Sequence, residues 1–149
     1  MQLKTQTAVI TGASTGIGRA IALAFAQQGA NLILHAKSNQ DQLSETVALV
    51  QEYGANCTTH LADLTCPESR ENFVQAVLAS GLINIWVNNA GADILTNVNS
   101  DLNFSEKLQL LWEMDVQGTI EVCRLIAEAF TETGKRANAV ILNMGWDQA

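Results

Sequence analysis

The chain has 149 residues, of which 48% are hydrophobic and 15% are charged, so it can bury one core of ordinary domain size and lacks the composition of a disordered chain. Eight Lys and Arg residues against fifteen Asp and Glu residues give a formal charge of -7, which disfavours general electrostatic binding to nucleic acid or anionic lipid. No apolar stretch is long enough to span a membrane and no signal-peptide pattern opens the sequence, so we expect a cytoplasmic protein.

Five short apolar runs predict five β-strands, separated by longer segments with helical periodicity. Each run is continuous rather than alternating between apolar and polar residues, which is typical of strands covered on both faces. The sequence has one proline and no linker, repeat or low-complexity tract, so we expect a single domain over residues 1–149. The predicted strands are Thr7–Ile10, Asn31–His35, Asn56–His60, Ile83–Val87 and Ala139–Leu142.

Helical signals follow the first two strands. Apolar residues at helical spacing form one face of the first predicted helix, and Gly29 stands where a C-cap glycine belongs. The second helix covers about residues 40–53, with Asn39 and Gln42 at capping-box spacing and Gly54 at its end. The apolar face of the first helix consists of Ile17, Ile21, Ala24 and Phe25.

Further helices are expected after the third and fourth strands. Thr65, with Glu68 three residues later, predicts the start of a helix that ends near Gly81. A helix pair is predicted over residues 104–130, closed by Gly134, and most of its apolar stripe should cover the sheet. That stripe contains Phe104, Leu108, Leu111, Trp112, Val116, Ile120, Cys123, Ala127 and Phe130.

The alternation of strand and helix predicts an α/β fold: a doubly wound parallel sheet in a Rossmann-type three-layer sandwich, with strand order 3-2-1-4-5. The ligand site of such a sheet lies outside the carboxyl ends of its strands. The fifth strand falls at a sheet edge, although its composition suits a strand paired on both sides. We therefore expect either a fragment, incomplete at its C-terminus, or a half-domain that needs a partner.

A glycine-rich segment between the first strand and the first helix predicts a phosphate-binding loop. Gly12 lets the chain turn sharply, Gly16 lets amides approach a pyrophosphate, and Gly18 lets the helix pack closely, while the helix N-terminus supplies partial positive charge. Ser14 and Thr15 add hydroxyl donors. The alternative, an ordinary glycine-rich turn, is disfavoured by the position between strand and helix. The predicted phosphate-binding residues are Gly12, Ser14, Thr15, Gly16, Ile17 and Gly18.

A second motif, Trp86-Val87-Asn88-Asn89-Ala90-Gly91, ends the fourth strand. Together with the TGxxxGIG segment it resembles the short-chain dehydrogenase/reductase family, over about residues 5–145. The resemblance implies that Asn88, Asn89, Ala90 and Gly91 steady the central sheet and line the cofactor cleft. It also implies that the pair Asp63 and Leu64 contacts the adenine ring, although Asp63 has an alternative role as a cap of the helix starting near Thr65.

The end of the second strand bears on the choice of dinucleotide. An NAD-selective site commonly carries an acidic residue there, which binds the ribose 2′-OH. Here Ala36 occupies that position, followed by Lys37, a cation able to pair with a 2′-phosphate, and Ser38, a possible further donor. We therefore expect NADP(H) to be preferred over NAD(H). The alternative is that Lys37 is a solvated loop lysine.

The family resemblance implies hydride transfer between a nicotinamide and a carbonyl or alcohol, with a Tyr as the proton donor, a Lys four residues later and a Ser. No Tyr-x-x-x-Lys is present, and the single tyrosine, Tyr53, is expected to pack. Gly145 and Trp146 occupy the serine positions, followed by Asp147 as a weak candidate carboxylate. Trp146 is expected either to wall a substrate pocket or to pack in the core.

Asp115 stands where the family has the Asn of an Asn-x-x-Gly pattern, whose Asn helps to position the catalytic Lys. We expect the Asp115 side chain to point inward and to act as the catalytic carboxylate of this chain, paired with a lysine beyond residue 149. Pairing with Arg124 or Lys135 is the alternative.

Several weaker constellations complete the sequence. His60, Asp63 and Cys66 are close together but lack a fourth ligand, so no metal site is expected. His35 either approaches an adenosine or is a structural imidazole, the second being favoured. The resemblance implies a homodimer or homotetramer formed through the helices over 100–133. The leading function is a hydride-transferring oxidoreductase acting on a small molecule, and the alternative is a non-catalytic dinucleotide-binding regulatory or scaffold protein.

Overall fold

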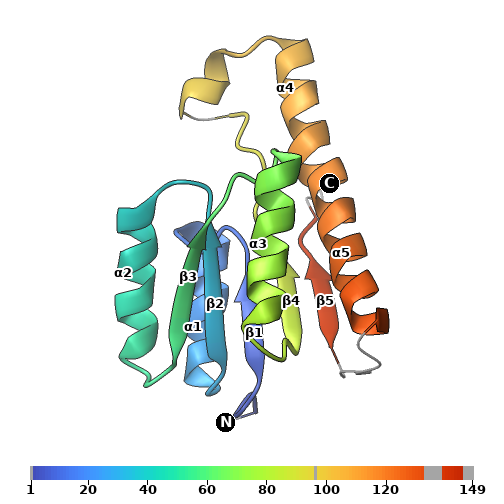
Figure 1. The fold of residues 1–149 in the computed structure, drawn as a ribbon. Coiled ribbons are helices and arrows are strands. Elements are labelled where there is room, and N and C mark those ends of the chain that lie inside the picture. Colours follow the sequence, from blue (N-terminus) through green and yellow to red (C-terminus); the bar gives the residue numbers. More distant parts are fainter. Residues whose placement is uncertain (1, 96, 133–138, 146–149) are drawn as a thin grey trace.

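A computed structural model describes residues 2–95, 97–132 and 139–145 of the chain, in which five parallel strands form a single sheet (Figure 1). The strand order is β3-β2-β1-β4-β5, which confirms the predicted topology. Ile10 at the end of β1 pairs with Leu34 of β2 and with Val87 of β4, so the carboxyl ends of the central strands lie side by side. The strands are β1 (Thr7–Ile10), β2 (Asn31–Ala36), β3 (Cys57–Leu61), β4 (Ile85–Asn88) and β5 (Val140–Asn143).

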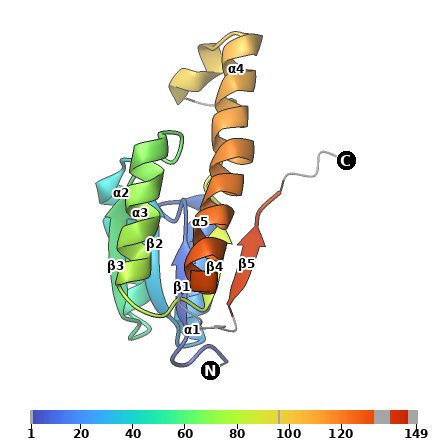
Figure 2. The ribbon, with the colours of Figure 1, turned by 45° about the vertical axis from the view of Figure 1, so that its right-hand side comes forward.

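Helices cover both faces of this sheet and give the expected three layers (Figures 1 and 2). One face carries α1 (Gly16–Gln27) and α2 (Gln40–Gln51), and the opposite face carries α3 (Pro67–Ala79) and α5 (Thr119–Glu132). Between β4 and α5 the chain forms the 3-10 helix η1 (Asn97–Asp101), the helix α4 (Phe104–Leu111) and the π-helix η2 (Trp112–Gly118). None of the helices in the described part of the chain is long and apolar enough to cross a membrane.

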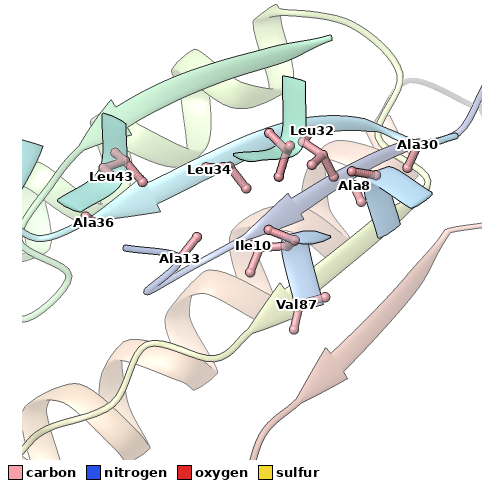
Figure 3. Close-up of a cluster of buried hydrophobic side chains, with 12 residues drawn as sticks. Ala8, Ile10, Ala13, Ala30, Leu32, Leu34, Ala36, Leu43 and Val87 are labelled. Atoms are coloured by element: carbon pink, nitrogen blue, oxygen red, sulfur yellow. The ribbon is translucent and has the colours of Figure 1, made fainter. Parts of the chain in front are cut away.

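The core on the side of α1 and α2 is built from branched strand residues and small helix residues (Figure 3). Leu32 and Leu34 of β2 pack with Leu43 of α2, while α1 buries only Gly18, Ala22 and Ala26. The predicted apolar face of α1 is confirmed in part: Ile21 and Phe25 pack against this core, whereas Ile17 is 56% exposed and Ala24 is exposed. The small buried residues of α1 let the helix axis lie close to the sheet.

The core on the other face contains aromatic side chains. Phe73 of α3 packs edge to face against Trp86 of β4, with 5.8 Å between ring centroids. Val122 and Ile126 of α5 complete this layer, and both are fully buried. The strands at the two edges of the sheet are less covered than predicted, because each pairs on one side only: Thr58 of β3 and Leu142 of β5 are exposed. The expectation of cover on both faces holds for the central strands alone.

Local capping signals are accurate for the first two helices. The Asn39 side chain accepts a hydrogen bond from the Gln42 amide at the start of α2, as predicted. Gly29 has φ of 86°, the left-handed conformation expected after a helix end. The third helix instead begins at Pro67, because Asp63 Oδ1 accepts hydrogen bonds from both the amide and the hydroxyl of Thr65 and keeps that residue in a turn.

The predicted helix pair over 104–130 is one long helix in the structure (Figure 2). No proline interrupts this segment. The π-helix η2 continues the helix through the region where a break between two helices was predicted. Its first part, α4, buries no residue and projects past the carboxyl ends of the strands (Figure 1). The stripe that was predicted to cover the sheet is exposed at Phe104, Leu108, Trp112, Val116 and Ile120. The predicted terminal glycine, Gly134, lies outside the described residues.

Candidate functional site

A cleft of about 270 Å³ opens at the carboxyl ends of the strands, where an α/β sheet binds its ligand. It lies between the loop after β1, the ends of β2 and β3, the loop after β4 and η2. Most of the predicted cofactor-binding residues line it; Gly16, Ile17 and Gly18 stand beside it at the start of α1. The lining residues are Gly12, Ser14, Thr15, His35, Ala36, Lys37, Ala62, Asp63, Leu64, Asn89, Ala90, Gly91 and Met114.

The glycines of the loop are required by close contacts. A Cβ on Gly12 would lie 2.9 Å from Ala90 Cα, and one on Gly18 would overlap the Gly12 carbonyl oxygen. Gly16 differs, since its φ of 55° is left-handed and a Cβ there would meet nothing within 4 Å. Gly12 and Gly18 therefore let the chain segments meet, whereas Gly16 leaves open space beside the helix start.

Thr11 and Asn89 join the loop after β1 to the loop after β4. Asn89 Nδ2 donates to the carbonyls of Thr11 and Gly12, at 3.0 and 3.1 Å. In return, Thr11 Oγ1 accepts from the amides of Asn89 and Ala90, both at 3.0 Å. Thr11 was not predicted as a site residue, although a polar residue directly after a buried strand could have indicated one.

Two residues missed by the sequence analysis hold the other side of the loop. Thr46 of α2 is fully buried and donates to the Ala13 carbonyl at 3.0 Å, and Arg19 Nη2 donates to the Ser14 carbonyl at 2.6 Å. A trans peptide points its N–H away from its carbonyl. The amides of Ser14 and Thr15 therefore point away from Thr46 and Arg19, and both Ser14 and Thr15 line the cleft.

The start of α1 adds to this concentration of donors. Thr15 is the N-cap residue, and no side-chain capping bond is found there among the described residues. The first N–H groups of a helix have no partner within the helix and carry the positive end of its dipole. The loop amides, the helix start and the space beside Gly16 together fit an anion such as a pyrophosphate.

Lys37 and Asp63 form an ion pair at the rim of the cleft, with 2.8 Å between Nζ and Oδ2. Partial burial alone would raise the pKa of Asp63, but hydrogen bonds from Lys37 and Thr65 lower it overall. The alternative of Asp63 as a helix N-cap is wrong, because the N-cap residue of α3 is Cys66. Lys37 is 63% exposed, yet it is paired rather than merely solvated.

Asp115 lies in η2, behind the loop after β4, and is half-buried rather than fully inward. Its Oδ1 accepts a hydrogen bond from the Ala92 amide at 2.9 Å, and burial raises its pKa. The alternative pairing with Arg124 is wrong, since Arg124 pairs with Glu121 and Glu128 on its own helix. Lys135 lies outside the described residues.

Asn88 does not line the cofactor cleft as predicted, because its side chain turns into the core. Asn88 Nδ2 donates to Asn143 Oδ1 at 2.8 Å, and its Oδ1 accepts from the Trp86 indole at 2.8 Å. These contacts join the ends of β4 and β5. A Cβ on Gly145, two residues after β5, would meet no atom of the described residues within 4 Å, and Trp146 and Asp147 lie outside those residues.

The remaining candidates stand apart from the cleft. Tyr53 follows α2, is 47% exposed, and accepts a hydrogen bond from Gln27 Nε2, so its expected packing role is wrong. His60 and Cys66 line a separate surface hollow between β3 and α3. No group of three or more metal-binding side chains is found in the described parts of the chain.

The sequence matches the family model for short chain dehydrogenase over residues 6–146. It is 31% identical over 143 residues to the 3beta-hydroxysteroid dehydrogenase 1 of Eggerthella lenta, covering 95% of this chain and 53% of that protein. The identity to the L-rhamnose 1-dehydrogenase (NADP(+)) of Thermoplasma acidophilum is 30% over 136 residues, covering 89% and 52% of the two chains.

Solved structures agree with this match. The crystal structure of a metagenomic short-chain oxidoreductase in complex with NADP has a TM-score of 0.80 at 27% identity, covering 96% of this chain and 63% of that one. The chain spans about half the length of the two curated relatives named above. Since the family model covers nearly the whole chain and the solved relative shares its fold, the chain belongs to the short-chain dehydrogenase/reductase family.

Proposed function

We propose that residues 1–149 form the dinucleotide-binding domain of an oxidoreductase that transfers a hydride between NADP(H) and a carbonyl or alcohol substrate. The observation that carries the proposal is the cleft at the carboxyl ends of the strands, which Ser14 and Thr15 line beside the N-terminus of α1. Family membership and the NADP complex of a solved relative support the cofactor class. When bound, the nicotinamide ring supplies or accepts the hydride.

Different residues of the cleft bind different parts of the dinucleotide. Ser14, Thr15 and the start of α1, residues 16–18, hold the pyrophosphate through backbone amides and hydroxyl groups. Asp63 and Leu64 contact the adenine side, at the end of β3. The loop Asn89–Gly91 lines the opposite side of the cleft, toward η2.

Lys37 is the basis for the proposed preference for NADP(H) over NAD(H). It follows directly after β2, where NAD-selective sites carry an acid for the ribose 2′-OH, and no acid stands there in this chain. Its ammonium group is exposed at the rim of the cleft and free to turn toward a 2′-phosphate at the expense of its exposed pair with Asp63.

Asp115 is the proposed catalytic carboxylate of the chain. Its hydrogen bond from Ala92 places it against the loop that follows Asn89–Gly91, on the side of η2. Burial disfavours the charged form of Asp115, and a lysine ammonium beside it would favour that form and lower the pKa again. Such a pair would orient the cation toward the substrate end of the cleft.

A homodimer or homotetramer formed through the helices over 100–133 is also proposed. The long helix exposes apolar residues at four-residue spacing along one face, from Phe104 at 80% to Ile120 at 60%. A continuous apolar stripe of this kind is unusual on a monomer surface and is typical of a helix covered by a second copy.

A non-catalytic dinucleotide-binding protein is the second candidate, because Gly145 stands at the position of the family serine and Tyr53 lies away from the cleft. Calorimetric titration of the full chain with NADPH and NADH, together with a turnover assay on a panel of ketones and alcohols, separates the two. Binding with turnover supports the oxidoreductase, binding without turnover supports the second candidate, and absence of binding rejects both.

A further inference from the structure

His35, the fifth residue of β2, is a buried histidine that contacts both the phosphate loop and the end of β3. It is 1% exposed. The Gly12 amide lies 3.3 Å from Nδ1, and the Ala62 carbonyl oxygen lies 2.9 Å from Nε2. A backbone amide only donates and a carbonyl only accepts, so Nδ1 is the acceptor and Nε2 carries the proton. Both ring nitrogens are therefore committed to defined partners in the neutral imidazole.

The contacts of His35 mirror those of Asn89 across the loop. In the Thr11–Gly12 peptide, the carbonyl accepts a hydrogen bond from Asn89 Nδ2 and the N–H donates one to His35 Nδ1. In the next peptide, the Gly12 carbonyl accepts from Asn89 Nδ2, and the Ala13 N–H donates to the His35 carbonyl at 2.8 Å. Two successive peptide planes are thus held between the side chain of Asn89, directly after β4, and His35 of β2.

This arrangement decides which amides face a ligand. The N–H groups of Gly12 and Ala13 are used inside the protein, so the amides left to bind an anion begin at Ser14. Rotation of the Thr11–Gly12 peptide would turn the Gly12 N–H into the cleft and disturb the planes that follow it. The imidazole is itself held, because it lies against Phe73 with 4.7 Å between ring centroids.

We propose that His35 is a positioning residue of the dinucleotide site, whose Nδ1 fixes the Thr11–Gly12 peptide and so directs the amides of Ser14 and Thr15 into the cleft. The identity of the ligand rests on the proposed function, whereas the effect on the loop does not. The contact with Ala62, next to Asp63, sets the imidazole orientation and ties the phosphate loop to the adenine side of the cleft.

Two isosteric substitutions separate the two ring nitrogens. His35→Asn places an oxygen near the Nδ1 position and keeps the acceptor for the Gly12 amide. His35→Gln places an amide group near the Nε2 position, so it keeps a donor for Ala62 and leaves Gly12 without its acceptor. We expect His35→Gln to bind ADP about tenfold more weakly than wild type and His35→Asn to stay within about twofold of it.

His60→Gln is the matched control, because His60 also contacts the Phe73 ring, with 5.7 Å between ring centroids, but lines the hollow between β3 and α3 rather than the cleft. Adenosine, which lacks the phosphates, is the control ligand and is expected to bind His35→Gln as it binds wild type. Melting temperatures of the full chain show whether a variant has merely lost stability.

Amide hydrogen exchange at Gly12 gives a readout that needs no ligand. Protection of this amide should fall at least tenfold in His35→Gln and persist in His35→Asn and His60→Gln. Equal ADP affinity of His35→Gln and wild type, or losses that follow melting temperature alone in all variants, would overturn the proposal. If wild type binds no ADP, the proposed function fails, and the Gly12 exchange rates still decide the part played by His35.

Discussion

Lys37 and Asp63 are 26 residues apart in sequence and meet at the rim of the cleft, with 2.8 Å between the ammonium and carboxylate groups. Lys37 is the proposed ligand of a 2′-phosphate, and Asp63 is the proposed contact of the adenine. The pair means that the cation is oriented along the rim before any ligand arrives. Cofactor choice should therefore depend on both residues.

Replacing Lys37 by Met should weaken binding of NADPH about tenfold and leave NADH within about twofold, because only the first carries a phosphate for the ammonium to bind. Isothermal titration with both dinucleotides measures this. Lys4→Met, at an exposed position before β1, controls for the loss of one charge. Tighter or equal binding of NADH by the wild type would refute the proposed preference.

Gly18→Ala should destabilise the fold by roughly 2 kcal/mol and abolish dinucleotide binding, since its Cβ would overlap the Gly12 carbonyl and crowd Asn89 Nδ2, at 2.6 Å. Gly16→Ala is the matched comparison. The Cβ of an alanine at position 16 would meet no atom within 4 Å, but the residue must adopt a left-handed φ, which costs about 1 kcal/mol. Urea denaturation gives both values, and a larger loss for Gly16→Ala than for Gly18→Ala would contradict the packing described.

Asp115→Asn keeps an oxygen for the Ala92 amide and removes the charge, so we expect the variant to fold at least as stably as wild type at pH 7. The sign follows from the pKa of Asp115, which burial raises on folding: the charged form opposes folding, and this penalty disappears as the pH falls and the carboxyl becomes protonated. Denaturation at pH 5 and pH 8 measures it. Undiminished turnover in the variant would reject a catalytic role for the charge.

Acid should weaken the fold through His35. Burial lowers the pKa of His35 to about 4, from 6.5 in an unfolded chain, so protons bind the unfolded state more readily. The contribution of the neutral His35 to the free energy of unfolding is complete above pH 6.5 and falls by up to about 3 kcal/mol as the pH drops to 4. Subtracting the pH profile of His35→Gln isolates this part from the neighbouring His60 and Asp63. A difference profile that stays flat from pH 7 to 4.5 would be inconsistent with a buried neutral imidazole.

The exposed stripe on the long helix predicts the outcome of two charge substitutions. Trp112→Glu combined with Ile120→Glu should lower the molar mass measured by light scattering to that of the monomer, because both side chains are more than half exposed in the single chain. Gln117→Glu on the same helix should leave the mass unchanged. A wild type that is already monomeric at micromolar concentration would remove the basis for the proposed oligomer.

Local patterns predicted the parts of this molecule that depend on neighbouring residues. The apolar run of β1 and the Asn39 cap each reflect a requirement met within a few positions of the chain. The alternation of strand and helix, with the right-handed crossover rule, predicted a parallel, doubly wound sheet, which the structure has. The glycine loop was recognised from its spacing, although the contact that requires Gly12 is with the distant Ala90.

Most of the failures have a different cause, namely contacts between distant segments. Helix α1 buries Ala22 rather than Ala24, because the sheet contacts only a narrow stripe of the helix. Thr65 is an exception, since its hydrogen bonds to Asp63, two residues earlier, are local and hold it in a turn before the helix. Thr46 enters the site from α2, 32 residues after Ser14. The periodicity of a single sequence does not show which distant segments come into contact, so Thr46 was identified as a site residue only from the structure.

The carbonyls of the phosphate loop are anchored by Asn89, Thr46 and Arg19, all residues of the chain itself. A dinucleotide that enters the cleft then has no backbone to immobilise, and little conformational entropy is lost by the protein on association. Capture of the cofactor should accordingly be a fast encounter of two preformed shapes, with its rate set by diffusion and charge rather than by folding of the loop.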